Sequence, residues 1–224
     1  MSIREVDAEV RASFSDVFSG ALRGQPCSVV GLGAEPQRLP VQLWSREADA
    51  LDLSLLDLCQ GHTVDLGCGP GRLTAALTRR GHVALGVDVV GEAVAQTRAR
   101  GAAALRRDVF ERLPGEGRWH SALLADGNVG IGGDPVALLR RARALVQADG
   151  RVVVELGGPG VPHLTRWAVL TAPGVRSAPF RWSTVGVDDI DAVARTAGFA
   201  GAEVHHLGDE RWCAVLGGAT GSAA

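Results

Sequence analysis

The sequence predicts an α/β fold in which a doubly wound, mainly parallel sheet is covered by helices on both faces. The first observation is that short apolar runs alternate with amphipathic segments from residue 61 onward, a pattern that requires a parallel sheet between helices. The second is a glycine-rich turn at 67–71, directly after the first run. The third is Asp88, which ends the second run. Together they are typical of a site for a nucleotide-type cofactor.

The individual elements are indicated by their own residues. Pro135 suits the first turn of a helix because it follows Asp134, and Gly150 ends that segment. The last two apolar runs are joined by the short turn 208–210 and therefore predict a hairpin. Strands are predicted around 64–66, 83–88, 104–110, 121–126, 150–156, 202–207 and 211–216, and helices over 72–80, 92–100, 135–148 and 187–195.

The first 60 residues predict a small lid of helices and a hairpin. Apolar residues at helical spacing over 7–22 and 46–59 predict two helices, and the stretch between them is broken by prolines and glycines. Within it, 39–44 fits a short strand or hairpin arm. Because ligands bind at the carboxyl edge of an open α/β sheet, we expect this lid to cover the mouth of a cofactor cleft. The cofactor-binding domain then spans 61–216, and the tail 217–224 is expected to be disordered.

Composition predicts one soluble domain. The chain has 224 residues, of which 46% are hydrophobic and 21% charged, enough for one sizeable core. Its net charge of −2 gives no electrostatic reason to expect nucleic acid, and it has no signal-peptide pattern or bilayer-spanning apolar stretch. We therefore expect a cytoplasmic protein without nucleic-acid or membrane partners, whose oligomeric state the sequence does not indicate. Four scattered cysteines predict neither a metal site nor a disulfide framework.

The spacing of the glycines separates two candidate cofactors. A dinucleotide site has the pattern G-x-G-x-x-G, whereas this chain has Gly67, Gly69 and Gly71, with Arg72 where the third dinucleotide glycine would fall. Asp65, just below the turn, is able to orient the loop toward a cofactor that carries positive charge. Both features favour an adenosyl cofactor with a sulfonium and an amino group over a nicotinamide dinucleotide.

The string VDLGCGPG at 64–71 resembles motif I of the class I S-adenosylmethionine (SAM) methyltransferases. The runs 83–88, 104–110 and 121–126 resemble the second, third and fourth strands of that family, and the resemblance extends over 61–216. It implies a Rossmann-like, seven-stranded sheet of order 3-2-1-4-5-7-6 whose last strand is antiparallel. It also implies an S-adenosylmethionine-dependent methyltransferase that releases S-adenosyl-L-homocysteine.

The same resemblance implies which residues hold the cofactor. Asp88 is expected to bind the ribose hydroxyls, and Val89 to lie against the adenine. Asp108 is expected to accept a hydrogen bond from the adenine amino group, and Val109 to donate its backbone N–H. Asp126 is expected either to orient the methionine amine or to contact the substrate. The implied cofactor-binding residues are Asp65, Gly67, Cys68, Gly69, Gly71, Asp88, Val89, Asp108, Val109, Ala125 and Asp126.

The acceptor site is expected at the end of the fourth strand. Methyl transfer is a direct displacement that depends mainly on positioning, and Asn128, the chain's only asparagine, follows that strand. Asn128 is a candidate catalytic and substrate-binding residue, or alternatively adopts a left-handed turn conformation between glycines. His163 is a candidate general base, or alternatively an exposed loop histidine. Trp44 is predicted to bind substrate, and Trp167 and Trp182 are further candidates for an aromatic acceptor pocket.

These observations predict a SAM-dependent methyltransferase that acts on a small-molecule acceptor in specialised metabolism. One alternative is RNA methylation, which the net charge and the lack of a basic module disfavour. The other alternative is a regulatory or partner protein that binds SAM without turnover. The fold does not decide which acceptor atom is methylated.

Overall fold

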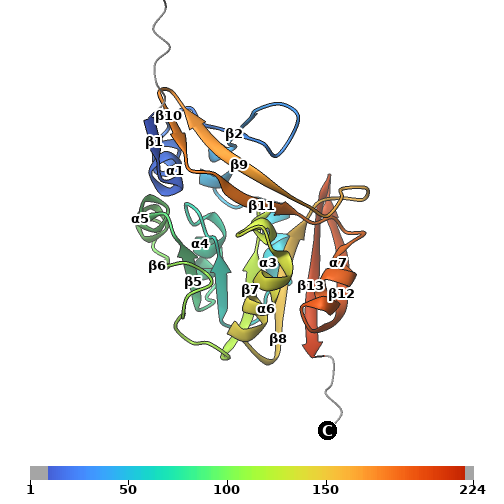
Figure 1. Ribbon diagram of the computed structural model, residues 1–224. Coiled ribbons are helices and arrows are strands. Elements are labelled where there is room, and N and C mark those ends of the chain that lie inside the picture. Colours follow the sequence, from blue (N-terminus) through green and yellow to red (C-terminus); the bar gives the residue numbers. More distant parts are fainter. Residues whose placement is uncertain (1–9, 220–224) are drawn as a thin grey trace, which may run out of the picture.

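Seven strands form the central sheet of the computed structural model, which describes residues 10–219 (Figure 1). Numbered among themselves along the chain, these strands lie in the order 3-2-1-4-5-7-6, and the seventh is antiparallel to both strands beside it. The order confirms the predicted doubly wound, Rossmann-like fold. The strands are β4 (Thr63–Leu66), β5 (Ala84–Asp88), β6 (Ala103–Arg106), β7 (Trp119–Leu124), β8 (Val146–Leu156), β12 (Phe199–Gly208) and β13 (Arg211–Ala219).

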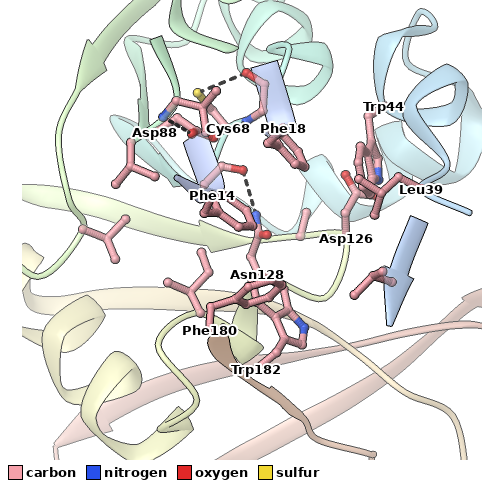
Figure 2. Close-up of a pocket in the computed structure, with 18 of the residues that line it drawn as sticks. Phe14, Phe18, Leu39, Trp44, Cys68, Asp88, Asp126, Asn128, Phe180 and Trp182 are labelled. Carbon is pink, nitrogen blue, oxygen red and sulfur yellow. Dashed lines mark hydrogen bonds between the residues drawn. The ribbon is translucent and has the colours of Figure 1, made fainter. Parts of the chain in front are cut away.

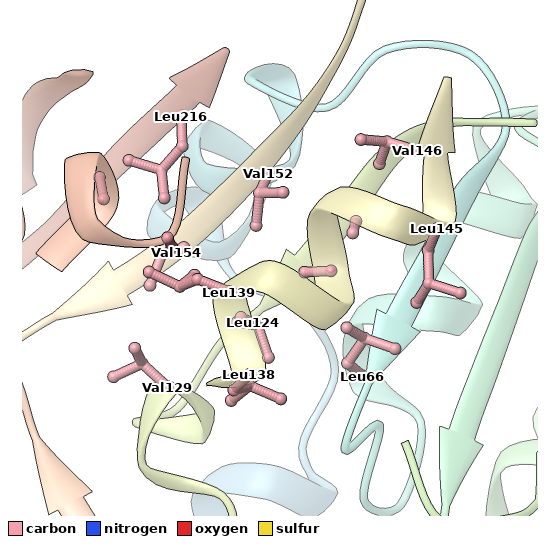
Figure 3. Packing of buried hydrophobic residues seen from close by; sticks show 14 of the residues in the cluster. Leu66, Leu124, Val129, Leu138, Leu139, Leu145, Val146, Val152, Val154 and Leu216 are labelled. Atoms are coloured by element: carbon pink, nitrogen blue, oxygen red, sulfur yellow. The ribbon is translucent and has the colours of Figure 1, made fainter. Parts of the chain in front are cut away.

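Helices cover both faces of this sheet. They are α3 (Ala50–Asp57), α4 (Arg72–Arg79), α5 (Gly91–Ala99), α6 (Pro135–Leu145) and α7 (Ile190–Thr196). Because successive side chains on a strand point to opposite faces, Leu124 of β7 packs with Leu138 of α6, as Figure 3 shows, whereas Leu123 packs with Leu77 of α4 on the other face. Asp134 accepts a hydrogen bond from the Ala137 N–H (2.9 Å) and so fixes the predicted start of α6.

A second sheet lies across the carboxyl edge of the central sheet (Figure 1). Together with α1 (Phe14–Leu22) and α2 (Val41–Ser45) we call it the lid. Its strands are β1 (Val10–Ala12), β2 (Ser28–Val30), β3 (Gln37–Arg38), β9 (Leu164–Ala172), β10 (Val175–Ser177) and β11 (Phe180–Thr184), in the order β1-β10-β9-β2-β3 with β11 paired to β9. The lid therefore joins the N-terminal region to the segment that follows β8.

The segments of the chain that form the lid differ from those that were predicted. Three of its six strands come from 164–184, which had been assigned to the cofactor-binding domain. Conversely, α3 from the N-terminal region packs on the central sheet. At the other end, Gly217 pairs with Gly201 and Arg151, so the tail predicted to be disordered begins as part of β13. Residues 220–224 of that tail lie outside the described residues.

The N-terminal elements also differ in detail. Of the helix predicted over 7–22, the first three residues lie outside the described part, and α1 begins only after Ser13, whose Oγ accepts a hydrogen bond from the Asp16 N–H (3.1 Å). Residues 39–44 were predicted as a strand or hairpin arm, but they lead into α2. The next helix, α3, begins at Ala50 because residues 49–52 form a capping box.

Two kinds of feature are absent from residues 10–219. None of their helices combines the length and the hydropathy needed to cross a membrane. They also contain no group of three or more histidine, cysteine or acidic side chains placed to hold a metal ion. All four cysteines are free and buried. Burial raises the pKa of the Cys68 thiol well above its usual value, so the thiol stays protonated and is a poor nucleophile.

Candidate active site

A cavity of about 680 Å³ lies between the carboxyl edge of the central sheet and the lid, within the range typical of small-molecule sites. Every predicted cofactor-binding residue lines it except Gly71, and Trp44 and Asn128 line it as well. Figure 2 shows Asp88 and Cys68 on one side of this space and Phe180 and Trp182 of the lid on the other. The structure therefore brings the two predicted halves of the site together.

The glycine turn after β4 needs glycine at each of its three positions. Gly67, Gly69 and Gly71 have φ values of 79°, 53° and 83°, in the left-handed region that favours glycine. A Cβ on Gly71 would also lie 2.5–2.7 Å from atoms of Thr97. Gly71 thus packs the turn against α5 from behind, which explains why it does not line the cavity.

Asp88 fixes the shape of that turn from the end of β5. Its Oδ2 accepts a hydrogen bond from the Gly69 N–H (3.0 Å), and its Oδ1 accepts one from the Val90 N–H (2.8 Å). Burial raises the pKa of Asp88 although these hydrogen bonds favour its ionised form. Each carboxylate oxygen has a further lone pair, so a hydroxyl in the cavity is able to donate to the same group.

Asp65 is a buried carboxyl group beneath the turn. Thr74 at the start of α4 donates a hydrogen bond from its Oγ1 to Asp65 Oδ2 (2.6 Å). Burial raises the pKa of Asp65 to about 7, because removal from water disfavours the ionised form. The charge of this carboxyl group therefore responds to any cation that enters the cavity near neutral pH.

Asn128 connects the turn to the loop after β7. Its side-chain Nδ2 donates hydrogen bonds to the carbonyl oxygens of Leu66 (3.1 Å) and Gly67 (2.8 Å). The residues with positive φ in this loop are Asp126 (51°), Gly127 (81°), Gly132 (76°) and Gly133 (69°), whereas Asn128 begins the short 3₁₀ helix η1 (Asn128–Gly130). The alternative that Asn128 occupies a left-handed turn position is therefore wrong.

Sequence reasoning missed a chain of paired charges beside the cavity, in which Asp52 and Arg72 are buried. Arg72 contacts both oxygens of Asp126 (2.6 and 2.7 Å) and also donates to Asp52. Arg211 of β13 donates to Asp52 (2.8 Å) and to both oxygens of Glu155 (2.8 and 3.0 Å). Glu155 closes the chain by accepting a hydrogen bond from the Asp126 N–H (2.9 Å). We call these five residues the charge network; it couples α3, α4, β8 and β13 to the loop after β7.

The pKa values of the acidic residues in the charge network depend on burial and on their arginine partners. Burial opposes ionisation of Asp52, but hydrogen bonds from Arg211 and Arg72 outweigh it and hold the pKa of Asp52 well below its usual value. Burial raises the pKa of Asp126, although Arg72 opposes this effect. At the edge of the network Arg46 pairs with Asp52 (2.6 Å) and Asp49 (2.8 Å), so its side chain is held by acidic partners of α3.

The lid wall of the cavity is aromatic. The ring centroid of Phe14 lies 5.4 Å from that of Phe18 and 5.0 Å from that of Phe180. Trp44 lies 5.8 Å from Phe18, and Trp182 lies 6.3 Å from Phe180. All five residues line the cavity, and Figure 2 shows them grouped around Asn128 and Asp126. Trp44 and Trp182 thus lie where an aromatic acceptor pocket was predicted.

Two candidates lie elsewhere. Trp167 is 65% exposed and is not part of the cavity wall. His163 is exposed, its backbone N–H donates to Asp189 (2.8 Å), and it does not line the cavity. The alternative interpretation of His163 as an exposed loop residue fits this position better than a general base does.

Comparison with known proteins agrees with this geometry. Residues 64–154 match the family model described as a methyltransferase domain. A search of the curated proteins finds no match to the sequence. A SAM-dependent methyltransferase from Bacteroides fragilis, solved with S-adenosyl-L-homocysteine, has a TM-score of 0.77 at 18% identity, covering 97% of this chain and 98% of that one.

Two further solved structures share the fold. The 1,6-didemethyltoxoflavin-N1-methyltransferase of Burkholderia thailandensis has a TM-score of 0.56 at 20% identity, covering 79% of this chain and 81% of that one. A sugar N-methyltransferase from Streptoalloteichus has a TM-score of 0.55 at 14% identity, covering 79% and 88%. The family model covers 64–154, less than half of the chain, and the solved structures show that the chain shares the fold of these methyltransferases. Both findings agree with the class that the sequence predicts.

Proposed function

We propose that this protein is a class I SAM-dependent methyltransferase that transfers the methyl group of SAM to a small-molecule acceptor enclosed beneath the lid, in a pathway of specialised metabolism. The observation that carries the proposal is the single cavity whose sheet side holds the predicted cofactor residues and whose lid side is aromatic. The solved relatives named for toxoflavin and sugar N-methylation support a small acceptor. Nothing in the net charge of −2 favours a polyanionic substrate.

The residues present fit the adenosyl cofactor. A Cβ on Gly67 would lie 2.7 Å from Asn128 Nδ2, so glycine there keeps Asn128 against the turn, and Gly69 has open space where its Cβ would stand, so the turn presents bare backbone to the cavity. We assign the ribose hydroxyls to Asp88 and the adenine to Val89, Asp108 and Val109. We assign the methionine end to Ala125 and Asp126, with Gly69 and Cys68 forming the floor between them.

The chain's own contribution to the reaction is positioning and exclusion of water. The cofactor supplies a methyl group activated by the adjacent sulfonium. The glycine turn and Asp88 hold the cofactor. The aromatic residues of the lid hold the methyl acceptor and keep water out. Alignment of this kind supplies about 7–11 kcal/mol for well-oriented reactants, so no covalent intermediate on the enzyme is required.

Calorimetry with SAM and S-adenosyl-L-homocysteine tests this proposal. We expect both to bind, together with release of S-adenosyl-L-homocysteine when an extract of small metabolites is added. Absence of binding to both compounds would overturn the proposal. Tight binding without any methylated product would favour the non-catalytic alternative, and a salt-sensitive shift of total RNA would favour RNA methylation.

Replacing Asn128 with alanine is expected to reduce kcat by about 100-fold while the affinity for S-adenosyl-L-homocysteine changes by less than about tenfold. The first effect follows from loss of a polar group beside the acceptor, worth roughly 1.5–3 kcal/mol, and the second from loss of two hydrogen bonds that tie the turn to η1. Steady-state kinetics and calorimetry measure the two effects separately. The control is Ile131→Val, a conservative change in the same cavity wall, which should leave both nearly unchanged. Equal losses in kcat and affinity would show that Asn128 acts only on the turn.

Binding of SAM near neutral pH is expected to release protons from Asp65. Because burial raises the pKa of Asp65 to about 7, this group is about half protonated there, and a cationic cofactor favours its ionised form, so roughly half a proton is released. The release should fade as the pH rises above about 8, where Asp65 is already ionised. Calorimetry in two buffers of different ionisation enthalpy measures it. Asp65→Asn should abolish the buffer dependence, and a wild-type enthalpy that is the same in both buffers contradicts the prediction.

Some sequence predictions stay predictions. They are a cytoplasmic location, the absence of nucleic-acid and membrane partners, and the division of the chain at residue 60. The assignments of individual site residues above are likewise proposals, each with its own substitution as a test.

A further inference from the structure

Aromatic side chains are concentrated along the wall of the cavity. The chain has five phenylalanines, five tryptophans and no tyrosine. Six of these rings line this one cavity: Phe14, Phe18, Trp44, Phe110, Phe180 and Trp182. Rings in offset or edge-to-face contact form flat surfaces that bind other flat rings. The acceptor chamber is therefore shaped for a planar aromatic molecule.

Each carboxylate of the cavity wall already accepts hydrogen bonds from the protein. Asp65 accepts from Thr74, and Asp88 accepts from two backbone amides. Asp108 accepts from the Phe110 N–H (2.9 Å), and both oxygens of Asp126 accept from Arg72.

The other residue types that could take a proton are missing from this wall. Among the described residues that line the cavity there is no histidine, lysine or glutamate, and the Cys68 thiol is held protonated by burial. A nucleophile that must lose a proton before it attacks, such as a phenol, needs a positioned base. The cavity therefore suits a nucleophile whose lone pair is free before the reaction begins.

The side-chain amide of Asn128 is oriented by its neighbours. Because Leu66 and Gly67 present carbonyl oxygens, the Nδ2 of Asn128 must face them. Its Oδ1 has no hydrogen-bond partner among the described residues, although Asn128 lines the cavity. Asn128 thus presents to the substrate an oxygen that accepts a hydrogen bond, and an N–H on the substrate matches it.

We propose that the acceptor is an uncharged aromatic amine, methylated on its nitrogen, with its N–H directed to Asn128 Oδ1. The proposal rests on the proposed function and deepens it by naming the substrate class. The nitrogen lone pair forms the new N–C bond, the C–S bond of the cofactor breaks, and its electron pair stays on sulfur. The product nitrogen becomes a cationic ammonium and loses its proton to water after release, so no protein base takes part.

The aromatic wall also suits the charge that this reaction creates. Positive charge moves from sulfur to nitrogen during the transfer, and the faces of Trp and Phe rings attract a cation by about 0.5–2 kcal/mol each. Trp44 and Trp182 are the strongest such groups in the cavity. An amine acceptor keeps a positive charge within this wall throughout the step, whereas an ionised oxygen or sulfur acceptor would neutralise it.

The test uses four probes with the full-length enzyme and saturating SAM: 1-aminonaphthalene, 1-naphthol, 1-naphthalenethiol and cyclohexylamine. The first three differ only in the nucleophilic atom, and the fourth is an amine without an aromatic ring. Mass spectrometry identifies each methylated product against a blank without enzyme. We expect N-methylation of 1-aminonaphthalene with kcat/KM at least about 100-fold above the other probes, and a rate that is independent of pH above the pKa of the arylammonium itself.

The variant Asn128→Ala provides a second measurement. It should reduce turnover of the amine by about 100-fold but reduce turnover of the thiol far less, because only the amine offers the lost N–H contact. A purely structural role of Asn128 would lower both equally and would contradict this part of the proposal.

The outcomes separate this proposal from the proposed function. Preference for the naphthol, the thiol or cyclohexylamine overturns the aromatic amine while the enzyme remains a small-molecule methyltransferase. No product from 1-aminonaphthalene, in the presence of calorimetric binding of S-adenosyl-L-homocysteine, overturns the amine alone. Failure to bind that compound or SAM overturns the proposed function itself.

Discussion

Replacing Asp52 with alanine is expected to lower the free energy of unfolding by about 3–5 kcal/mol, the range for breaking one partner out of a buried ion pair. Asp52 is fully buried and accepts from Arg72 and Arg211, so its removal leaves two buried guanidinium groups without their shared partner. Urea unfolding monitored by circular dichroism measures the loss. The effect should extend to activity, since Arg72 also holds Asp126 at the cofactor cavity.

The matched control is Asp57→Ala in the same helix. Asp57 also pairs with an arginine, Arg80, but its side chain is 61% exposed, and surface substitutions of this kind change stability by about 0.5 kcal/mol or less. Because the pKa of Asp52 is lowered in the folded state, its contribution is present above the unfolded pKa of about 4 and is lost as the pH falls through the folded pKa. A loss at neutral pH no larger than that of Asp57→Ala contradicts the prediction.

Replacing Asp88 with alanine is expected to weaken SAM binding by about 100-fold or more. Hydrogen bonds to a charged group contribute about 1.5–3 kcal/mol each, and 1.4 kcal/mol corresponds to a tenfold change in affinity. The substitution also frees the N–H groups of Gly69 and Val90, which Asp88 holds, so the turn loses its fixed shape. Calorimetry on the folded variant measures the change.

The control for this effect is Glu92→Ala, on the helix that follows. Glu92 pairs with Arg23 (3.1 Å) at the surface and does not line the cavity, so the affinity for SAM should not change. Asp88→Asn should give an intermediate loss, because an amide oxygen retains one acceptor but not the charge. Wild-type affinity in Asp88→Ala would remove Asp88 from the proposed cofactor site.

The central sheet and its cofactor side could be predicted because their signals are local. The glycine turn, Asp88 and Asp108 each follow directly from the strand that places them, and parallel strands present their ends at one edge. Strand order followed from the resemblance, since the order of the elements along this chain is the order of the family. Local pattern and global topology agree here, and the predicted strand order was confirmed.

The lid could not be predicted in the same way because its pairings are non-local. β9 pairs with β2, more than 130 residues earlier, and β10 pairs with β1 at similar separation. Within 164–184, Pro173 and Gly174 indicate a turn between two local strands, but no residue of the segment reveals a partner so far along the chain. The acceptor wall was therefore assigned to Trp44, Trp167 and Trp182 without the strand pairing that places this segment, and the contribution of Phe180 was missed.

The charge network was missed although one signal was present. Arg72 is the first residue of α4, where the helix dipole disfavours a cation. An arginine at such a position, next to a buried strand, requires acidic partners to be stable. In the sequence it was interpreted only as the absence of a glycine, and its partners Asp52 and Asp126 lie 20 and 54 residues away.

The shared origin of the lid limits how the specificity of this protein is redesigned. Transplanting the N-terminal residues of a relative would leave β9 and β10 facing new partners, with open backbone edges that promote association between molecules. A successful exchange of substrate preference must therefore move 10–45 and 164–184 together as one cassette. In laboratory evolution, libraries that vary both segments at once should yield folded variants with new acceptors more often than libraries confined to either.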